Sequence, residues 1–474
     1  MDNPARVSDE RCDCLVVGGG PAGCALAVLL AGRGLSVVLV DHGRAHYSGP
    51  NETLLASSLP MLERTGLAAL LRDCALPDPL RHGAIWGSDT LQWRDGEQQG
   101  LWLRRGPFDT ALRAAATARG VRVVAPARIT LGARGEACEF LLQAGQRQYV
   151  TPAFIAVATG RASLAPFFTA QNEASGPRTF ACTLVGEPGE ADRSTAVVEA
   201  LPEGWIWTHV PPQGPASACV LLDAEQVHEQ GLDTLVASAL ARALGPAQRL
   251  RSHRLLHAND ATARCRRTEA DVLLLGDAAA TIDPLASQGV EKALAAADHA
   301  AAVLGTALQH SDWWPALRLL HAQWERGLFA AHRATAAAFL AQETRFLDAP
   351  FWRRRTIAAP APTSPPSGPL RCAQNVSIAP VLVRQGDQFA ESQGARDALT
   401  GDTLSHIGYV PVLPLLRVFA VPRLVGEATT LAGHDPSLFV LPPRAVHAAI
   451  LELFHRGWLV QAPLTNAGSA AAPR

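Results

Sequence analysis

Lysine is almost absent from this chain of 474 residues: among its 42 lysine and arginine residues, only Lys292 is a lysine. Any mechanism that needs a lysine elsewhere is therefore excluded. The arginines are matched by 43 acidic residues, which leaves a formal net charge of −1. Proteins that bind nucleic acids normally show a basic excess, so we expect no nucleic-acid partner.

Cysteine motifs and long apolar runs are also lacking. The nine cysteines are scattered without a C-x-x-C pair, so no metal site is expected. Unpaired thiols are typical of a reducing compartment, and no N-terminal segment combines a basic start, an apolar core and a cleavage site. We therefore expect a cytoplasmic protein. No stretch of about twenty uninterrupted apolar residues occurs, so no membrane span is expected.

The clearest motif that is present lies at residues 18–23, where the glycines of Gly-Gly-Gly-Pro-Ala-Gly have the G-x-G-x-x-G spacing. A predicted strand, Cys14–Val17, precedes it, and a predicted helix, Cys24–Gly32, follows it. The next predicted strand, Ser36–Val40, ends at Asp41, whose carboxylate can accept hydrogen bonds from ribose hydroxyls. In such a turn the glycines let a pyrophosphate approach the backbone at the start of the helix. The residues predicted to bind a dinucleotide here are Gly18, Gly20, Pro21, Ala22, Gly23 and Asp41.

A second group of polar residues follows another apolar strand, predicted at Asp271–Leu275. Asp277 comes directly after this strand and can bind a ribitol hydroxyl. A long helix is predicted from Ser287 to Leu308, and N–H groups at its start can stabilise the electron-rich edge of a reduced flavin ring. The candidate residues of this region are Asp277, Pro284, Ser287, Gln288 and Gly289.

The order of predicted elements indicates a mixed α/β fold: a Rossmann-like FAD-binding domain, an inserted antiparallel-sheet substrate domain and a small C-terminal module. The prediction of the inserted sheet is based on four short β-rich runs: Thr179–Val185, Ala196–Leu201, Trp205–Val210 and Cys219–Leu222. Further helices are predicted at Thr110–Arg119, from Trp313 to about Phe346 and, with an amphipathic pattern, at Arg444–Arg456, and further strands at Val121–Val124 and Phe154–Val157. A proline-rich stretch indicates a linker. The predicted boundaries are 1–175 with 255–355 for the FAD domain, 176–254 with part of 75–105 for the substrate domain, 356–369 for the linker and 370–474 for the module.

With these segments the chain resembles the FAD-dependent monooxygenase superfamily of p-hydroxybenzoate hydroxylase. More narrowly, it resembles the branch that holds tryptophan halogenases, geranylgeranyl reductases and flavoproteins that mature quinone cofactors. Residues 51–54 are similar to the Gly-Glu-Ser/Thr segment of this branch, which implies that Glu52 lies along FAD. Residues 105–112 are similar to its R-x-x-F-D-x-x-L element, which implies that Arg105 contacts the cofactor.

Two more segments carry the same resemblance. Residues 158–161 are similar to the D-A-T-G-R segment, in which Val157 or the alanine stands in place of the usual acid. This match implies that Thr159 and Gly160 lie beside FAD. Residues 204–211 resemble the G-W-x-W strand that lies over the flavin face. The resemblance covers about residues 13–345 and implies FAD as the cofactor.

Hydroxylation of an electron-rich aromatic ring through a flavin hydroperoxide is the reaction that the resemblance favours. The branch includes a flavoprotein that hydroxylates a protein-bound tryptophan of quinohemoprotein amine dehydrogenase during biogenesis of cysteine tryptophylquinone. The resemblance therefore implies a protein or peptide substrate, the small subunit of an amine dehydrogenase, with the C-terminal module as a docking surface. Since the chain shows no second glycine fingerprint, we expect NAD(P)H to bind transiently or a flavin reductase to supply electrons.

A flavin-dependent halogenase is a competing hypothesis. Halogenases of this branch handle hypohalous acid with a lysine that follows the Gly-Glu-Ser/Thr segment, whereas the only lysine here is Lys292. The segment after Trp207 also has one residue more than the halogenase motif before its proline. Two further functions suit the same fold: an FAD-dependent reductase of prenyl double bonds, which needs a long apolar tunnel, and an FAD-binding protein without catalysis.

His209 is the candidate catalytic residue, because a neutral histidine on the strand over the flavin can relay protons. A structural histidine is the alternative interpretation. Lys292, near the start of its predicted helix, is interpreted as a solvated side chain. The alternatives are that it pairs with the neighbours of Glu291 or faces the flavin site. Trp205 and Trp207 are expected not to face inward together from one strand.

Overall fold

The computed structural model describes residues 10–43, 52–54, 56–76, 81–93, 101–142, 145–162, 164, 167–286, 288–357, 366–439 and 441–462. The chain divides into two compact units, Met1–Ala359 and Pro360–Arg474. Each unit is described by itself.

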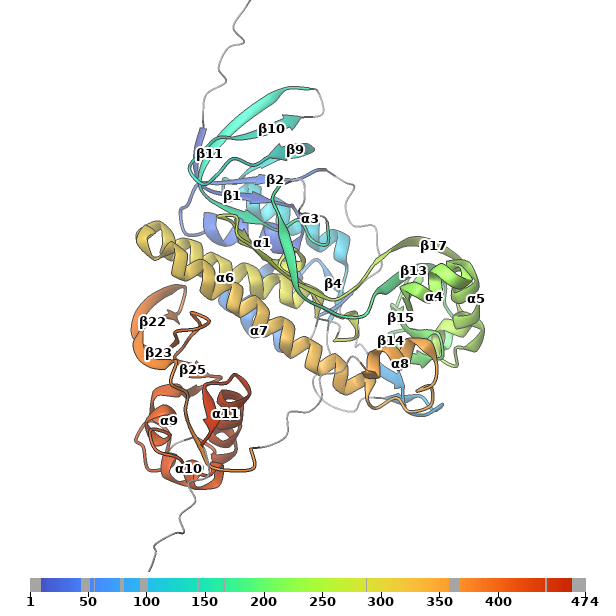
Figure 1. The fold of residues 1–474 in the computed structure, drawn as a ribbon. Coiled ribbons are helices and arrows are strands. Elements are labelled where there is room, and N and C mark those ends of the chain that lie inside the picture. The colour runs from blue at the N-terminus through green and yellow to red at the C-terminus, as the bar shows by residue number, and fades with distance from the viewer. Residues whose placement is uncertain are drawn as a thin grey trace, which may run out of the picture. The chain divides into compact units, whose positions relative to one another are not determined.

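A mainly parallel sheet forms the part of the first unit that holds the glycine motif (Figure 1). Its strands, from one edge to the other, are β8 (Arg122–Val124), β2 (Val37–Val40), β1 (Glu10–Val17), β11 (Arg147–Val157), β10 (Cys138–Leu142) and β9 (Ala127–Thr130), and β19 (Leu273–Leu274) pairs with β11. Strand β1 pairs in parallel with β2 and β11, β2 also pairs in parallel with β8, and β11 with β19, whereas β10 runs antiparallel to β11. Residues 14–17 of β1 are all buried, as expected of a strand that is covered on both faces. The predicted strands of this sheet are confirmed, although β19 is shorter than its prediction.

Helix α1 (Pro21–Ala31) packs against α3 (Arg105–Ala118) and α6 (Gly289–Gln309) beside this sheet. The structure begins α3 at Arg105 rather than at the predicted Thr110, with Pro107 in its first turn. Proline is tolerated there because N–H groups of the first turn have no acceptor within the helix. This earlier start places Arg105 on a helix instead of a loop.

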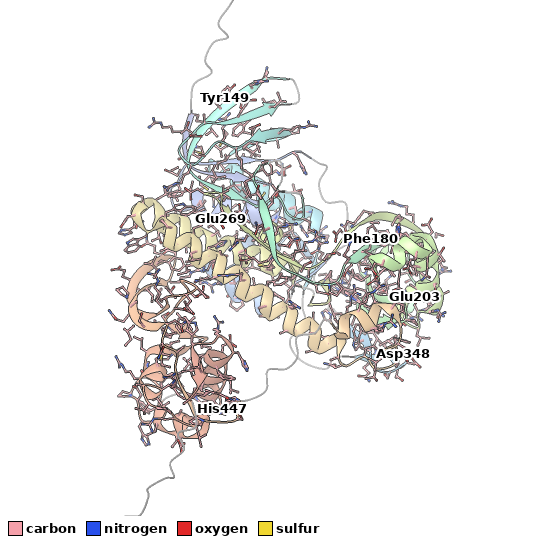
Figure 2. The ribbon with its side chains drawn as sticks, in the orientation of Figure 1. Tyr149, Phe180, Glu203, Glu269, Asp348 and His447 are labelled. Carbon is pink, nitrogen blue, oxygen red and sulfur yellow. The ribbon has the colours of Figure 1, made fainter. Side chains whose placement is uncertain are left out.

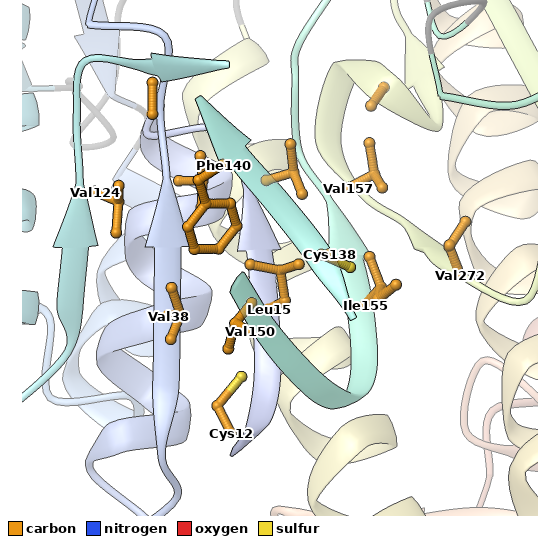
Figure 3. Packing of buried hydrophobic residues seen from close by; sticks show 14 of the residues in the cluster. Cys12, Leu15, Val38, Val124, Cys138, Phe140, Val150, Ile155, Val157 and Val272 are labelled. Carbon is orange, nitrogen blue, oxygen red and sulfur yellow. The ribbon is translucent and has the colours of Figure 1, made fainter. Parts of the chain in front are cut away.

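Strand β10 covers the other face of the parallel strands (Figure 3). Phe140 of β10 lies among Leu15 of β1 and Val38 of β2, and all three side chains are buried. Alternate residues of a strand point to opposite faces, so the remaining side chains of β1 face α1. Packing on both faces holds the carboxyl ends of these strands in fixed positions.

The second sheet of this unit is almost wholly antiparallel. Its strands, in spatial order, are β17 (Arg251–Asp260), β13 (Thr179–Glu187), β16 (Ala216–Asp223), β15 (Gly204–Val210), β14 (Thr195–Leu201), β5 (Arg81–Ile85) and β6 (Gln92–Trp93). Only β14 and β5 run parallel. Each predicted β-rich run falls within one strand, so the prediction of a second, antiparallel sheet is confirmed. Figure 2 labels Tyr149 on the first sheet, and Phe180 and Glu203 mark the region of the second.

The second long helix is shorter than predicted. Helix α7 (Trp314–Leu340) ends before Phe346, and α8 (Pro350–Ile357) follows. In the intervening turn the buried carboxylate of Glu343 accepts the Gly87 N–H at 2.8 Å and binds the Arg345 guanidinium at 2.6 Å. Smaller sheets join β3 (Glu52–Leu54), β7 (Leu101–Leu103) and β4 (Ala75–Leu76), and join β12 (Ala170–Ser175), β18 (Arg264–Thr268) and β20 (Ala280–Thr281). Within the described ranges, none of the helices combines the length and the apolar character needed to cross a bilayer.

The second unit has a hydrophobic core of its own. Its main elements are the hairpin of β22 (Val376–Gln385) and β23 (Gln388–Asp397), and the helices α9 (Val412–Val418), α10 (Val425–Ala432) and α11 (Pro443–His455). The predicted amphipathic helix is confirmed as α11, whose Val446, Ile450 and Leu453 are buried in this core. A core made only of residues from this unit is the property that lets a module fold separately.

Candidate functional site

The turn between β1 and α1 has the shape of a pyrophosphate cradle. Gly18 has a φ of +112°, and a Cβ there would lie 2.3 Å from the Ala158 carbonyl oxygen. A Cβ on Gly23 would lie 1.9 Å from the Gly18 carbonyl oxygen, so neither position can carry a side chain. Gly20, at the N-cap of α1, instead faces open space, with no heavy atom within 4 Å of a built Cβ. N–H groups of the first helical turn have no acceptor within the helix, so this space fits an anion.

Asp41, at the end of β2, is tied to the same turn. Its Oδ2 accepts the Gly19 N–H at 2.7 Å, its Oδ1 accepts the Gly43 N–H at 2.7 Å, and its side chain is buried. Burial raises the pKa of this carboxyl, but the two N–H donors and the nearby Arg113 outweigh that effect and hold the pKa below its ordinary value. An ionised carboxylate has about four acceptor positions, so Asp41 keeps capacity for ribose hydroxyls while it shapes the glycine turn.

Glu52 and Arg105 come from separate sequence segments and bind one another. The Arg105 Nη1 donates to Glu52 Oε1 at 2.6 Å, and its Nε donates to Asp109 Oδ1 at 2.8 Å. Burial raises the pKa of Asp109, while the Arg105 charge opposes that rise. The pairing fixes the glutamate of β3 against the start of α3. That these two residues also contact FAD stays a prediction.

Thr159, Gly160 and Asp277 follow the carboxyl ends of two adjacent parallel strands, β11 and β19. Ligands of open α/β sheets bind at this edge. Arg161, which follows Gly160, donates from Nε to Asp277 Oδ2 at 3.2 Å. The two segments predicted separately from the sequence therefore meet through Arg161, a residue that the prediction of ligands had not included.

The start of α6 provides the last part of this edge. Gln288 is the N-cap of α6, and Gly289, its first residue, is exposed with no heavy atom within 4 Å of a built Cβ. Pro284 lies in a preceding 3-10 turn, Pro284–Ala286, and the predicted Ser287 lies outside the described residues. The open N-terminus of this long helix can stabilise negative charge. A direct role for these residues in FAD binding stays a prediction.

One face of the antiparallel sheet lies beside these residues. A row of direct cross-strand partners, which share a face of the sheet, is formed by His257, Thr183, Cys219 and Trp207. Burial raises the pKa of the Cys219 thiol to about 11, and the charges of Arg161 and Glu52 both act on it. Burial and the Arg161 charge lower the pKa of His257. The row is therefore electrostatically coupled to Glu52 of the predicted cofactor site and to Arg161, which binds Asp277 of that site.

His209 lies two residues beyond Trp207 on β15 and has 7% of its surface exposed. Its ring meets Trp207 edge-on with centroids 4.4 Å apart, and it meets Trp102 of β7 with centroids 5.8 Å apart. Alternate residues of a strand share a face, so Trp205, Trp207 and His209 point the same way. The expectation that the two tryptophans do not face inward together is wrong, because both pack in one hydrophobic cluster.

Lys292 is not solvated, and that interpretation is wrong. Its side chain has 0% exposure, with Nζ 3.7 Å from Asp277 Oδ1 and 4.0 Å from Glu325 Oε2. The side chain is buried because α6 packs against both α1 and α7 and offers little surface to solvent. The sequence did carry a signal for Glu325. It follows Leu317 and His321 at helical spacing on the buried stripe of α7, where a charged residue is unusual.

Two buried histidines, His321 of α7 and His299 of α6, continue the group of polar residues around Lys292. His321 Nε2 lies 2.8 Å from the Leu274 carbonyl oxygen, which can only accept, so Nε2 carries the proton. Its Nδ1 then accepts from His299 Nδ1 across 3.0 Å. Burial lowers the pKa of His321 to about 4, and burial raises the pKa of Glu325 to about 7, against the opposing Lys292 charge. At neutral pH His321 is therefore uncharged and Glu325 is poised to titrate.

The raised pKa of Glu325 predicts a change of stability with pH. The folded state holds this proton more tightly than the unfolded chain, so the stabilisation is complete below the unfolded pKa of 4.5 and is lost as the pH rises through about 7. Glu325→Gln cannot ionise, and relative to the wild type it should gain about 3 kcal/mol across this window. Urea unfolding of both proteins at a series of pH values checks this.

His321→Gln provides the matched comparison. The pKa of His321 is lowered to about 4, so the wild type loses stability as the pH falls from about 6.5 towards 4, and the variant should gain relative stability in that direction. Opposite slopes for the two variants are expected. A difference between Glu325→Gln and the wild type that does not vary with pH would contradict the assigned titration.

Comparisons with known proteins agree with this arrangement. Residues 11–314 match a family model described as an FAD binding domain. Among solved structures, the peptidyl tryptophan dihydroxylase QhpG, essential for tryptophylquinone cofactor biogenesis, is 24% identical at a TM-score of 0.66, and the match covers 94% of this chain and 99% of that one. The flavin-dependent halogenase CmlS is 18% identical at a TM-score of 0.71, over 96% of this chain and 98% of that one. The p-nitrophenol 4-monooxygenase of Pseudomonas putida is 18% identical at a TM-score of 0.56, over 73% and 93%. No curated protein matches.

Proposed function

The chain belongs to the FAD binding domain family, and from this premise we propose that it is an FAD-dependent monooxygenase that hydroxylates an electron-rich aromatic ring. In the finer form of the proposal, the ring is a tryptophan side chain of a protein or peptide on the way to cysteine tryptophylquinone. The fold shared with the peptidyl tryptophan dihydroxylase supports this form. Bound FAD supplies the electrons that reduce oxygen, so that one oxygen atom becomes the ring hydroxyl and the other leaves as water.

The observation that carries the proposal is the sheet face beside the predicted cofactor site. Trp207 and Cys219 are direct cross-strand partners on that face, and the charges of Arg161 and Glu52 act on the Cys219 thiol. The Trp207 ring on this face can orient a substrate ring through offset or edge-on contacts and exclude water from it. The residues of this chain would thus position the ring while the cofactor performs the oxidation.

We assign the parts of FAD to the edge of the parallel sheet. The open space before Gly20 would hold the pyrophosphate, Asp41 would bind the ribose, and Asp277 would bind the ribitol chain. The N-terminus of α6 would lie at the flavin ring, where its N–H groups would offset negative charge. The remaining residues assigned to the cofactor are Gly18, Pro21, Ala22, Gly23, Glu52, Arg105, Thr159, Gly160, Pro284, Ser287, Gln288 and Gly289.

His209 is the residue to which we assign proton transfer. His209→Gln keeps a polar side chain between Trp102 and Trp207, so we expect FAD binding to persist while hydroxylation falls about tenfold or more, as for loss of a general acid or base. Steady-state turnover and the pH profile of kcat measure this. The control is His253→Gln on β17, an exposed residue of the same sheet. Equal turnover by the wild type and His209→Gln would contradict the assignment.

Halogenase activity is disfavoured by the position of the only lysine. Lys292 is fully buried between two carboxylates and therefore cannot present an ammonium group to hypohalous acid at the substrate face. With reduced FAD, oxygen and bromide, we expect mass spectra of free tryptophan and of a tryptophan peptide to show no bromine. A brominated product would contradict the argument from fixed catalytic groups.

The partners and the compartment complete the proposal. NAD(P)H or a flavin reductase supplies the electrons, and the substrate is the small subunit of an amine dehydrogenase. All nine cysteines are free thiols, which supports a reducing cytoplasm. The test is to incubate the full-length holoenzyme with a reductant, oxygen and that subunit, with a small free phenol in parallel. The proposal expects the protein tryptophan to gain oxygen and the phenol to be a poor substrate; the reverse preference would overturn the finer form.

A further inference from the structure

We propose that Lys292 is a positioning residue for FAD, which acts by fixing the carboxylate of Asp277 from the core side. The inference rests on FAD binding and not on the identity of the substrate. It starts from the unusual placement of the only lysine in the chain, fully buried in the first turn of α6. The positive end of a helix disfavours a cation, and burial of a charge is costly unless it is paired. A specific electrostatic partner must therefore offset both costs.

Asp277 is that partner. Its carboxylate is approached on both oxygens: Arg161 donates to Oδ2 at 3.2 Å from the more exposed side, and the Lys292 ammonium lies 3.7 Å from Oδ1 on the buried side. Two cations on opposite oxygens limit rotation of the carboxylate plane. Each ionised oxygen accepts about two hydrogen bonds, so the held carboxylate still has free positions for a ribitol hydroxyl.

Lys292 also lies near a carboxylate that binds the backbone just before Asp277. Glu325, whose Oε2 lies 4.0 Å from Lys292 Nζ, accepts the Gly276 N–H through Oε1 at 3.3 Å. Gly276 has a φ of +63°, and a Cβ there would lie 2.9 Å from the Ala22 Cβ. The turn before Asp277 therefore packs on the helix of the first glycine motif. The Lys292 ammonium thus lies near the Asp277 carboxylate and near the Glu325 carboxylate, which accepts the backbone N–H of Gly276.

A double-mutant cycle on FAD affinity tests the inference. Apoprotein of the full chain is titrated with FAD, and the dissociation constant is read from the change in flavin fluorescence. Lys292→Met should raise the Kd about tenfold or more, because the Asp277 carboxylate would keep Arg161 on Oδ2 but lose the cation that holds Oδ1. In an Asp277→Asn background the same substitution should change the Kd by less than about threefold, because the group through which Lys292 acts is gone.

A merely structural role makes a different prediction. If Lys292 only supports the core, Lys292→Met should weaken FAD binding equally in both backgrounds, and that result would overturn the inference. Glu325→Gln is the matched control within the same cluster. It keeps an acceptor for Gly276 and leaves the Asp277–Lys292 contact intact, so its Kd should stay within about threefold of the wild type.

A second pair of variants keeps the test decisive if Lys292→Met alone does not fold. Lys292→Met with Glu325→Gln removes one charge of each sign from the core, which is tolerated better than one unpaired charge. The Kd for FAD is then compared between this double variant and the same variant with Asp277→Asn. Loss of affinity only where Asp277 is present supports the inference, and equal affinities or equal losses in both backgrounds reject it.

Discussion

Gly20→Asp should leave the protein folded but unable to retain FAD. A Cβ built at this position meets no heavy atom within 4 Å, so the fold should tolerate a side chain there. The new carboxylate would occupy the space before α1 in which we place the pyrophosphate, and its charge would repel the phosphates. We expect the Kd for FAD to rise about a hundredfold or more. Absorbance of the purified protein near the flavin bands, together with FAD titration of the apoprotein, measures the effect.

The same chemical change elsewhere provides the control. Gly426 lies in the first turn of α10, in the second unit, and a built Cβ there also meets nothing within 4 Å. Gly426→Asp places a carboxylate at a helix N-terminus, where it is favourable, and should not alter FAD binding. A Gly20→Asp protein that is purified with a full complement of FAD would reject the assigned pyrophosphate site.

Truncation at Ser364 should separate cofactor binding from modification of a protein substrate. The second compact unit begins at Pro360 and has its own core, and none of the residues assigned to FAD belongs to it. We propose that it forms part of the docking surface for a protein substrate, since recognition of a folded partner needs several hundred square ångströms on each side. The truncated protein should therefore bind FAD as tightly as the full chain and lose nearly all turnover of the protein substrate.

A point variant makes the same test without removing any chain. Ile450 is fully buried in the core of the second unit, and Ile450→Asp should unfold that unit, because an unpaired charge in a core costs several kcal/mol. FAD retention with loss of protein-substrate turnover is expected again. Loss of FAD and solubility in either protein, or unchanged turnover of the protein substrate, would contradict a separate docking module.

The parts of the site that could be predicted from the sequence are those encoded by local patterns. The glycine spacing around Gly20, the acid Asp41 after β2 and the acid Asp277 after β19 each follow from a strand and its next few residues. Parallel pairing then brings strand ends to one edge regardless of side-chain detail. The antiparallel sheet was predictable for the same reason, since short apolar runs between turn residues are typical of strands.

The parts that could not be predicted depend on packing between distant segments. The burial of Lys292 results from the placement of α6 between α1 and α7, and its approach to Glu325 joins two helices. The hydrogen bond between Arg105 and Glu52 likewise joins two distant segments. The local pattern of each segment identifies its own residue as a candidate but does not predict that the two residues bind one another. The role of His209 stays a prediction, because it depends on contacts with a cofactor or substrate. The predicted domain boundaries also stay predictions.

The origin of the oxygen atom tests the proposed function most directly. The reduced full-length holoenzyme is mixed with heavy-isotope dioxygen and the amine dehydrogenase small subunit, and the modified residue is located by peptide mass spectrometry. The proposed monooxygenase reaction predicts heavy oxygen on the ring of a tryptophan, one labelled atom for each hydroxyl formed. A hydroxyl that carries oxygen from water, or an unmodified subunit after full reoxidation of the flavin, would contradict it.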